Sequence, residues 1–144
     1  MATRFPAPAP RIAARGETLV EVTYALGAVA LAGEAVVHVQ QFFDFYHGVR
    51  WIGPLFLANA AACVVVIAGL AYPPTRILAA LAGVVTSVAA LGGLIISYGT
   101  GLFGWQEAGF ATAIELVLIF EVAAAILLSA ALAASGLLHG RGAD

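Results

Sequence analysis

Glu34, His38 and Gln41 are the residues of this chain whose types and spacing most suggest chemistry. They are separated by four and then by three positions, which places all three side chains on one face of a helix. Further along the same face lie Gly27 and Ala30, small residues that let another helix approach closely. We therefore expect this face to look toward neighbouring helices, with a carboxylate, an imidazole and an amide available to a ligand.

Two other apolar segments offer partners for this face. Counted from the ends of their segments, Glu34 lies about 10 Å below the membrane boundary, Asn59 lies at almost the same depth, and Glu121 lies about 12 to 15 Å deep. Glu115 lies nearer the boundary and six positions from Glu121, so the two glutamates do not share a helix face. Charged groups at membrane depth cost several kcal/mol and usually face one another inside a bundle. We therefore expect Glu34, Asn59 and Glu121 to converge on His38.

One histidine with two carboxylates is a donor set for a transition-metal ion. Glu34, His38 and Glu121 are therefore a candidate metal site, which a residue of the following loop, Asp44 or His47, could join. The paired Glu-x-x-His motif of di-iron helical bundles is absent, because the spacing here is Glu-x-x-x-His and occurs once.

Other chemistries suit the same cluster, and the sequence leaves them open. Carboxyl groups inside a membrane can relay protons or neutralise a cationic ligand. His38 and Gln41 can equally hold the head group of a quinone, a lipid or another amphiphile. In the remaining alternative, the polar side chains only hydrogen-bond one another and fix the register of the helices.

Four long apolar segments must position these residues. The chain is 62% hydrophobic and 10% charged, with a mean hydropathy of +1.02, whereas roughly 25% of the residues in a typical soluble domain are charged. About 20 helical residues cross the hydrocarbon core of a bilayer, and none of the four segments alternates as a membrane β-strand would. We predict an all-α integral membrane protein, a four-helix transmembrane bundle. Its helices are expected at about residues 18–41, 52–72, 75–98 and 110–138.

The transmembrane domain is expected to cover residues 17–139, between a disordered tail at residues 1–16 and a short tail at residues 140–144. The first ten residues are rich in proline and alanine and lack the apolar core and cleavage site of a signal peptide. Pro73 and Pro74 cannot continue a helix, so the second segment ends there. The connection that follows is so short that helices two and three must be antiparallel neighbours.

The placement of the arginines predicts the orientation, because positive charge is retained in the cytoplasm. Arg50 lies alone at one end of the segments. Five arginines lie at the other end, namely Arg4, Arg11, Arg15, Arg76 and Arg141. Both termini are therefore expected to be cytoplasmic. The use of arginine without lysine, beside many alanines, is typical of GC-rich bacterial genomes, so we expect a bacterial cytoplasmic membrane.

Aromatic residues gather in the two connections at the opposite end, FFDFYHGVRWIG at residues 42–53 and GTGLFGWQEAG at residues 99–109. Aromatic side chains prefer the headgroup level of a membrane, so both loops are expected to lie along the outer surface. Alternatively, they form a lid or interface over a site. The lid residues would then be Asp44, His47, Trp51 and Trp105.

Several functions are excluded or left open. The net charge is −2 and there is no cluster of basic residues, so the sequence does not indicate a nucleic-acid-binding surface. There is no phosphate-binding glycine loop, no Cys-x-x-Cys motif and no second transmembrane histidine for a bis-histidine haem. The expected partner is the lipid bilayer, with a homo-oligomer or a larger membrane complex as further alternatives.

We expect an outward-facing polar pocket in a binding or accessory subunit for a small ligand, a lipid or a proton. The first alternative is a membrane enzyme or redox protein that uses the His/Glu site with a metal or a quinone. The second is a purely structural subunit of an oligomer. The sequence specifies no cofactor and leaves enzymatic activity open.

Overall fold

The computed structural model describes residues 10–108 and 112–140 of the chain, and it is all-helical apart from the connections within these ranges. The long helices are α1 (Pro10–Gln41), α2 (Ile52–Ala71), α3 (Arg76–Gly99) and α4 (Thr112–Gly140). A π-helical turn, η1 (Phe42–Tyr46), continues α1, and a 3-10 turn, η2 (Pro73–Thr75), joins α2 to α3. The prediction of an all-α protein is confirmed.

Each long helix contains a stretch that is long and apolar enough to cross a membrane. These stretches are Ala14–Tyr46, Ile52–Ala71, Pro73–Gly99 and Ile114–Gly136. Their outward faces carry large apolar side chains such as Val65, Leu78 and Ile95, each about 70% exposed. Exposed apolar surface on this scale is costly in water and favourable against acyl chains. Four helices of this kind point to a multi-pass membrane protein.

The helices begin and end close to the expected positions, except at the N-terminus. There α1 begins at Pro10 rather than near residue 18, so residues 10–16 of the expected disordered tail are helical. Proline is well suited to the first turn of a helix, and alanine and arginine are strong helix formers, so this extension is favourable without tertiary contacts. Residues 1–9 and 141–144 of the expected tails lie outside the described residues.

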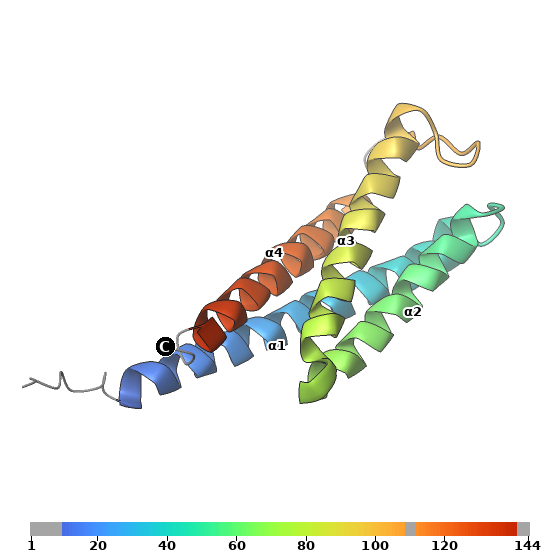
Figure 1. Cartoon of the computed structure of the whole chain (residues 1–144). Helices are drawn as coiled ribbons and strands as arrows, with labels where there is room; N and C mark the ends of the chain where they lie inside the picture. Colours follow the sequence, from blue (N-terminus) through green and yellow to red (C-terminus); the bar gives the residue numbers. More distant parts are fainter. Residues whose placement is uncertain (1–9, 109–111, 141–144) are drawn as a thin grey trace, which may run out of the picture.

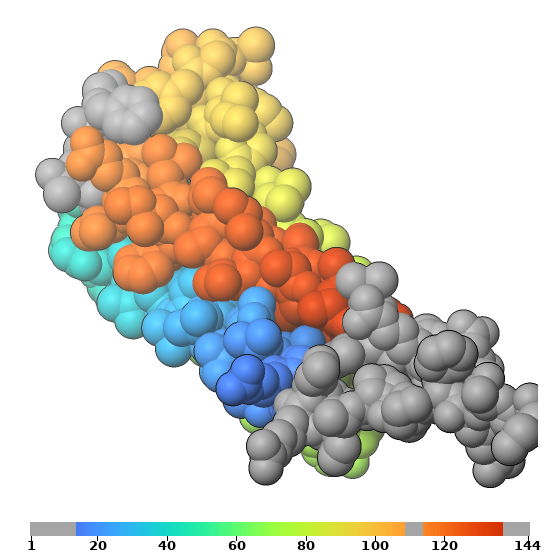
Figure 2. Space-filling model, turned by 90° about the vertical axis from the view of Figure 1, so that its left-hand side faces the viewer, coloured from blue at the N-terminus to red at the C-terminus, as the bar shows by residue number. Residues whose placement is uncertain are grey.

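The four helices form a ring in which α1 packs against α2 and α4, and α3 packs against the same two helices. Figure 2 shows α4, in orange and red, lying along α1, in blue, on one face of the molecule. At the end that carries the two aromatic loops, α3 diverges from α2 (Figure 1). The N-terminal end of α1, the C-terminal end of α4 and the η2 turn lie at the other end (Figure 1).

The short connection makes α2 and α3 antiparallel, as the two prolines predict. Thr75 Oγ1 donates to the carbonyl oxygens of Gly69 and Tyr72, at 2.8 and 3.0 Å, and Arg76 Nε donates to Leu70 O at 3.0 Å. The carbonyl oxygens of Gly69 and Tyr72 also accept from the backbone N–H groups of Tyr72 and Thr75, so these side chains add to the backbone bonds that end α2. Arg76 also pairs with Glu21 of α1, which ties the turn to the first helix.

The helices approach closely where a glycine on one helix faces a large side chain on another. A Cβ atom added to Gly27 of α1 would lie 2.6 Å from Leu128, and one added to Gly83 of α3 would lie 2.5 Å from the same leucine. Leu128 of α4 is fully buried and so fills the space that the two glycines leave. In a membrane there is no hydrophobic force between helices, because the lipid tails are as apolar as the side chains. Small residues favour helix association there, because they let the helices come close enough for dispersion contacts.

Leu128→Ala should therefore lower the free energy of unfolding by about 2 to 5 kcal/mol, the usual cost of removing a buried leucine side chain. Ile126→Ala is the matched control on the same helix, since Ile126 is 62% exposed and should change stability little. Denaturant unfolding of the detergent-solubilised protein measures both. Equal losses in the two variants would contradict the packing described here.

Candidate functional site

Glu34 is buried at the centre of the ring, with none of its surface exposed. Asn59 Nδ2 of α2 donates to Glu34 Oε1 at 2.8 Å, and Ser87 Oγ of α3 donates to Glu34 Oε2 at 2.9 Å. Each carboxylate oxygen therefore has one donor, and the donors come from two different helices. The bond to Ser87 crosses the ring from α1 to the helix opposite it.

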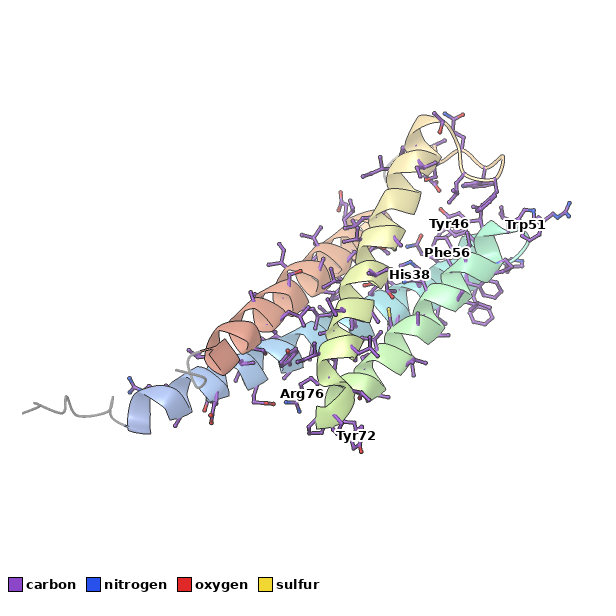
Figure 3. The ribbon with its side chains drawn as sticks, viewed as in Figure 1. His38, Tyr46, Trp51, Phe56, Tyr72 and Arg76 are labelled. Carbon is purple, nitrogen blue, oxygen red and sulfur yellow. The ribbon has the colours of Figure 1, made fainter. Side chains whose placement is uncertain are left out.

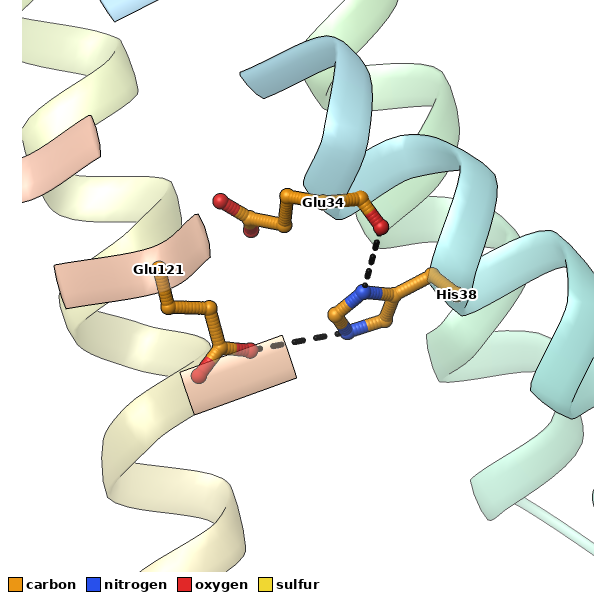
Figure 4. A group of neighbouring side chains, drawn as sticks. All are labelled: Glu34, His38 and Glu121. Carbon is orange, nitrogen blue, oxygen red and sulfur yellow. Dashed lines mark hydrogen bonds and ion pairs between the residues drawn. The ribbon is translucent and has the colours of Figure 1, made fainter. Parts of the chain in front are cut away.

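His38 lies one turn further along α1 and is also buried. Its Nδ1 is 3.0 Å from the carbonyl oxygen of Glu34, and its Nε2 is 3.7 Å from Oε1 of Glu121 on α4. Figure 4 shows the ring of His38 between these two glutamates. Only 1% of Glu121 is exposed, and its Oε2 has no hydrogen-bond partner among the described residues.

The structure thus brings together four of the five expected ligand-binding residues, Glu34, His38, Asn59 and Glu121, in one cluster. The fifth, Gln41, is buried one turn beyond His38 and lines the adjoining cavity. Glu115, by contrast, is exposed on α4, as the six-residue separation from Glu121 predicts. With Ser87 included, each of the four helices contributes a side chain to the cluster.

A cavity of about 640 Å³ lies next to this cluster, between α2 and α3 and near the two aromatic loops. We call it the α2–α3 cavity. Its wall is mostly apolar, so it is less polar than the pocket that the sequence predicts. His38, Gln41, Asn59 and Glu121 form a polar part of the wall. The α3 side includes four small residues, namely Ala89, Ala90, Gly92 and Gly93.

Aromatic side chains close the loop end of the cavity. Tyr46 stacks on Phe56 with a centroid distance of 4.5 Å and meets Trp105 edge to face at 5.8 Å. The hydroxyl of Tyr46 donates to Glu107 Oε2 at 2.6 Å, and Trp105 Nε1 donates to the same oxygen at 3.3 Å. Figure 3 shows Tyr46, Phe56 and His38 near one another at this end. These contacts join the loop after α3 to η1.

The four expected lid residues do not act as one group. Trp105 lines the cavity. Trp51 is more than half exposed, lies under the Arg50 guanidinium at 5.1 Å and is not part of the cavity wall. Asp44 and His47 are exposed, and neither belongs to the wall or to the group of metal-binding atoms. The positions of Asp44 and His47 therefore give no support to a metal site that either residue would join.

The two loops also store backbone strain beside the cavity. Trp51 and Phe103 both have positive φ angles, of 70° and 50°, although neither is glycine. Their rings face each other at 6.5 Å. Such conformations cost about 1 to 3 kcal/mol each and persist only where surrounding contacts hold them.

Sequence reasoning missed Ser87, Tyr46, Phe56 and Glu107 as site residues. Ser87 was visible as a polar interruption in an apolar segment, but nothing in its position showed that it faces Glu34 across the ring. Glu107 lies in an irregular loop, where no helical period indicates which way a side chain points.

No protein-family model matches this chain, and neither the curated proteins nor the solved structures yield a match. The buried cluster and the α2–α3 cavity adjoin each other. Together they combine a fully hydrogen-bonded carboxylate, a histidine and glutamate that contact each other only loosely, and an apolar space beside them.

Ser87→Ala should lower the free energy of unfolding by about 1 to 3 kcal/mol, because it leaves a buried carboxylate oxygen of Glu34 without a donor. Ser129→Ala on the exposed face of α4 is the control and should be close to neutral. In a Glu34→Leu background the Ser87→Ala effect should vanish, since no carboxylate remains to be satisfied. Denaturant unfolding in detergent measures this cycle, and an unchanged Ser87→Ala effect in that background would contradict the assignment.

Proposed function

We propose that this chain is a small multi-pass protein of a bacterial cytoplasmic membrane that binds a membrane-dissolved amphiphile in the α2–α3 cavity. The observation that carries the proposal is the division of the cavity wall into a large apolar part and a compact polar part formed by His38, Gln41, Asn59 and Glu121. An apolar chain suits the first part and a polar head group suits the second. Such a division is usual in binding sites, where a few polar groups orient a mostly apolar ligand.

The size of the cavity supports this proposal. Small-molecule sites occupy about 300 to 1,000 Å³, and the cavity has about 640 Å³. The space exists because α3 has small residues where α2 and α4 face it: Gly92 has no neighbour within 4 Å of an added Cβ, and Gly93 has only Leu102 at 3.7 Å. At Gly83, in the first half of α3, an added Cβ would instead meet side chains from the other helices, with Leu128 at 2.5 Å.

The exposure of the wall residues supports entry from the bilayer. Leu55 of α2 is 44% exposed, and Val85 and Ile96 of α3 are 67% and 46% exposed, yet all three line the cavity. Residues that both line a cavity and face outward mark its opening, which therefore lies between α2 and α3. All three belong to stretches that can cross a membrane. An opening at that level faces acyl chains, so the ligand would enter from the lipid phase.

The proposed polar contacts follow from the hydrogen bonds already made. Both oxygens of Glu34 have donors, so that carboxylate is held by the protein. Glu121 lines the cavity, and its Oε2 has no partner among the described atoms. A hydroxyl or amine of a ligand head group would supply the missing donor, and Gln41 offers a second contact nearby.

Filling the cavity tests the proposal. Gly93→Leu and Ala90→Phe should lower the affinity for an amphiphile at least tenfold, because the new side chains occupy its space. Gly136→Leu is the matched control, since Gly136 is exposed on α4 and has no neighbour within 4 Å. Native mass spectrometry detects lipids or quinones that remain bound after purification. Decylubiquinone and a lysophospholipid, titrated in nanodiscs, serve as defined probes read by tryptophan fluorescence, since Trp105 lines the cavity.

Loss of retained molecules in the two cavity variants but not in Gly136→Leu is the expected result. The proposal would be overturned if the unaltered chain and all three variants retained the same molecules and bound each probe with the same affinity. The comparison of the two probes shows whether the head group is a quinone or a phosphate ester.

We also propose that both termini face the cytoplasm and that the cavity lies toward the outer side. The support is the arginine distribution together with the arrangement of the helices. Arg76, the first residue of α3, lies at the same end of the bundle as the N-terminal end of α1 and the C-terminal end of α4 (Figure 3), whereas Arg50 lies in the loop before α2, at the cavity end.

Cysteine labelling tests this orientation. The single native cysteine, Cys63, is buried, so Cys63→Ser gives a background without a thiol. In intact cells a membrane-impermeant maleimide should label Gly48→Cys, in the exposed loop before α2, and should label Pro74→Cys, in η2, only after permeabilisation. The reverse pattern would place the termini outside.

A further inference from the structure

The buried cluster beside the cavity has the donor atoms and spacing of a metal site. Glu34, His38 and Glu121 each offer one ligand atom, and these atoms all lie within 4.8 Å of one another. None of the three residues is more than 6% exposed. Three features of the hydrogen bonding and geometry of these side chains also favour an ion between them.

The hydrogen bond of His38 determines which ring nitrogen is free. Nδ1 lies 3.0 Å from a backbone carbonyl oxygen, which can only accept, so Nδ1 carries the hydrogen. In the neutral ring Nε2 then presents a lone pair, and it points toward Glu121. An N–H bond to a backbone carbonyl is also how metal-binding histidines are usually oriented.

The distance between Nε2 and Glu121 Oε1 is the second indication. At 3.7 Å it is too long for a hydrogen bond. Two ligand atoms that each lie about 2.0 to 2.2 Å from a tetrahedral ion are about 3.3 to 3.6 Å apart. The separation is therefore close to that of two atoms sharing one ion.

The third indication is the difference between the two glutamates. Asn59 and Ser87 orient Glu34 by one hydrogen bond to each oxygen, and a carboxylate has lone pairs left for a metal after two such bonds. Glu121 Oε2 is completely buried and has no partner within the described part of the chain. Leaving a buried polar atom unpaired is costly. No arginine within residues 14–108 and 114–136 pairs with either Glu34 or Glu121. A cation between them would give Glu121 Oε2 a partner and would offset the repulsion between the two carboxylates.

We propose that Glu34, His38 and Glu121 bind one divalent first-row transition-metal ion, such as Zn²⁺ or Mn²⁺, with Asn59 and Ser87 as positioning residues. One imidazole and two carboxylates suit this class of ion, and two negative charges match its charge. Three protein ligands leave at least one coordination position for another molecule. His38 and Glu121 line the α2–α3 cavity, so that position faces the proposed amphiphile site. The metal site does not require the amphiphile to bind.

Metal titration of the purified full chain tests the proposal. Protein without a polyhistidine tag is treated with chelator, dialysed, and titrated with Zn²⁺ and Mn²⁺ by calorimetry, with metal content measured after equilibrium dialysis. We expect one ion per chain. His38→Ala and Glu121→Gln should weaken binding at least tenfold, whereas Glu115→Gln, which removes an exposed carboxylate from the same helix, should not. Replacement by Co²⁺ should give a visible d–d absorption band that changes in Glu121→Gln.

Ser87→Ala keeps all three metal ligands, so it tests the proposal even if a variant that lacks a ligand does not fold. It should weaken metal binding by about 10- to 100-fold, the usual effect of losing an orienting partner. Absence of a stoichiometric ion in the unaltered chain, or equal binding in His38→Ala, would overturn the proposal. So would a loss of binding in His47→Ala alone, because His47 is exposed in the loop and would then hold an adventitious ion. Gly93→Leu should keep the metal, so failure of the amphiphile proposal is distinguishable from failure of this one.

Discussion

The arrangement of the four helices depends on one carboxylate that has no access to water. Glu34 of α1 is buried at the centre of the ring, and the helices around it contain stretches apolar enough to cross a membrane. Its two oxygens can find donors only on other helices, and they find them on α2 and α3. Because an unpaired buried carboxylate would cost several kcal/mol, this requirement fixes the rotation and the axial position of three helices at once. Apolar contacts specify the rotation of a helix far less strictly, because an apolar side chain can face either lipid or another helix.

Close packing and the cavity are two results of the same use of small residues. At the end near the termini, Gly27 and Gly83 admit Leu128, and the helices meet closely. Nearer the aromatic loops, Gly92 and Gly93 have almost nothing opposite them, and α3 diverges from α2. The same residue type therefore closes one half of the ring and opens the other. What differs is whether a side chain from another helix lies within contact distance of the glycine.

The sequence predicts the helices and most of the cluster because both follow from simple periodic rules. Segment length and hydropathy suffice to locate the four helices, and a spacing of four and three residues places Glu34, His38 and Gln41 on one face. The cost of charge in lipid then predicts that Glu121 turns inward. Ser87 could not be assigned in this way, because its role depends on how α3 is rotated about its own axis, and the position of one serine in the sequence does not reveal that rotation. Tyr46 and Glu107 could not be assigned either, because their contact joins two irregular segments 61 positions apart in sequence.

The contrast between the two glutamates is the strongest argument that this cluster has a role beyond holding the helices together. Glu34 is fully hydrogen-bonded and would serve a structural purpose by itself. Glu121 adds a second buried carboxylate 3.7 Å from a histidine and leaves one oxygen unpaired. A leucine of similar volume at that position would avoid the desolvation cost, and replacing buried ionic groups by apolar ones is often neutral or stabilising. A residue that is costly for the protein alone is explained when something else binds to it, and Glu121 lies beside His38 and in the wall of the cavity.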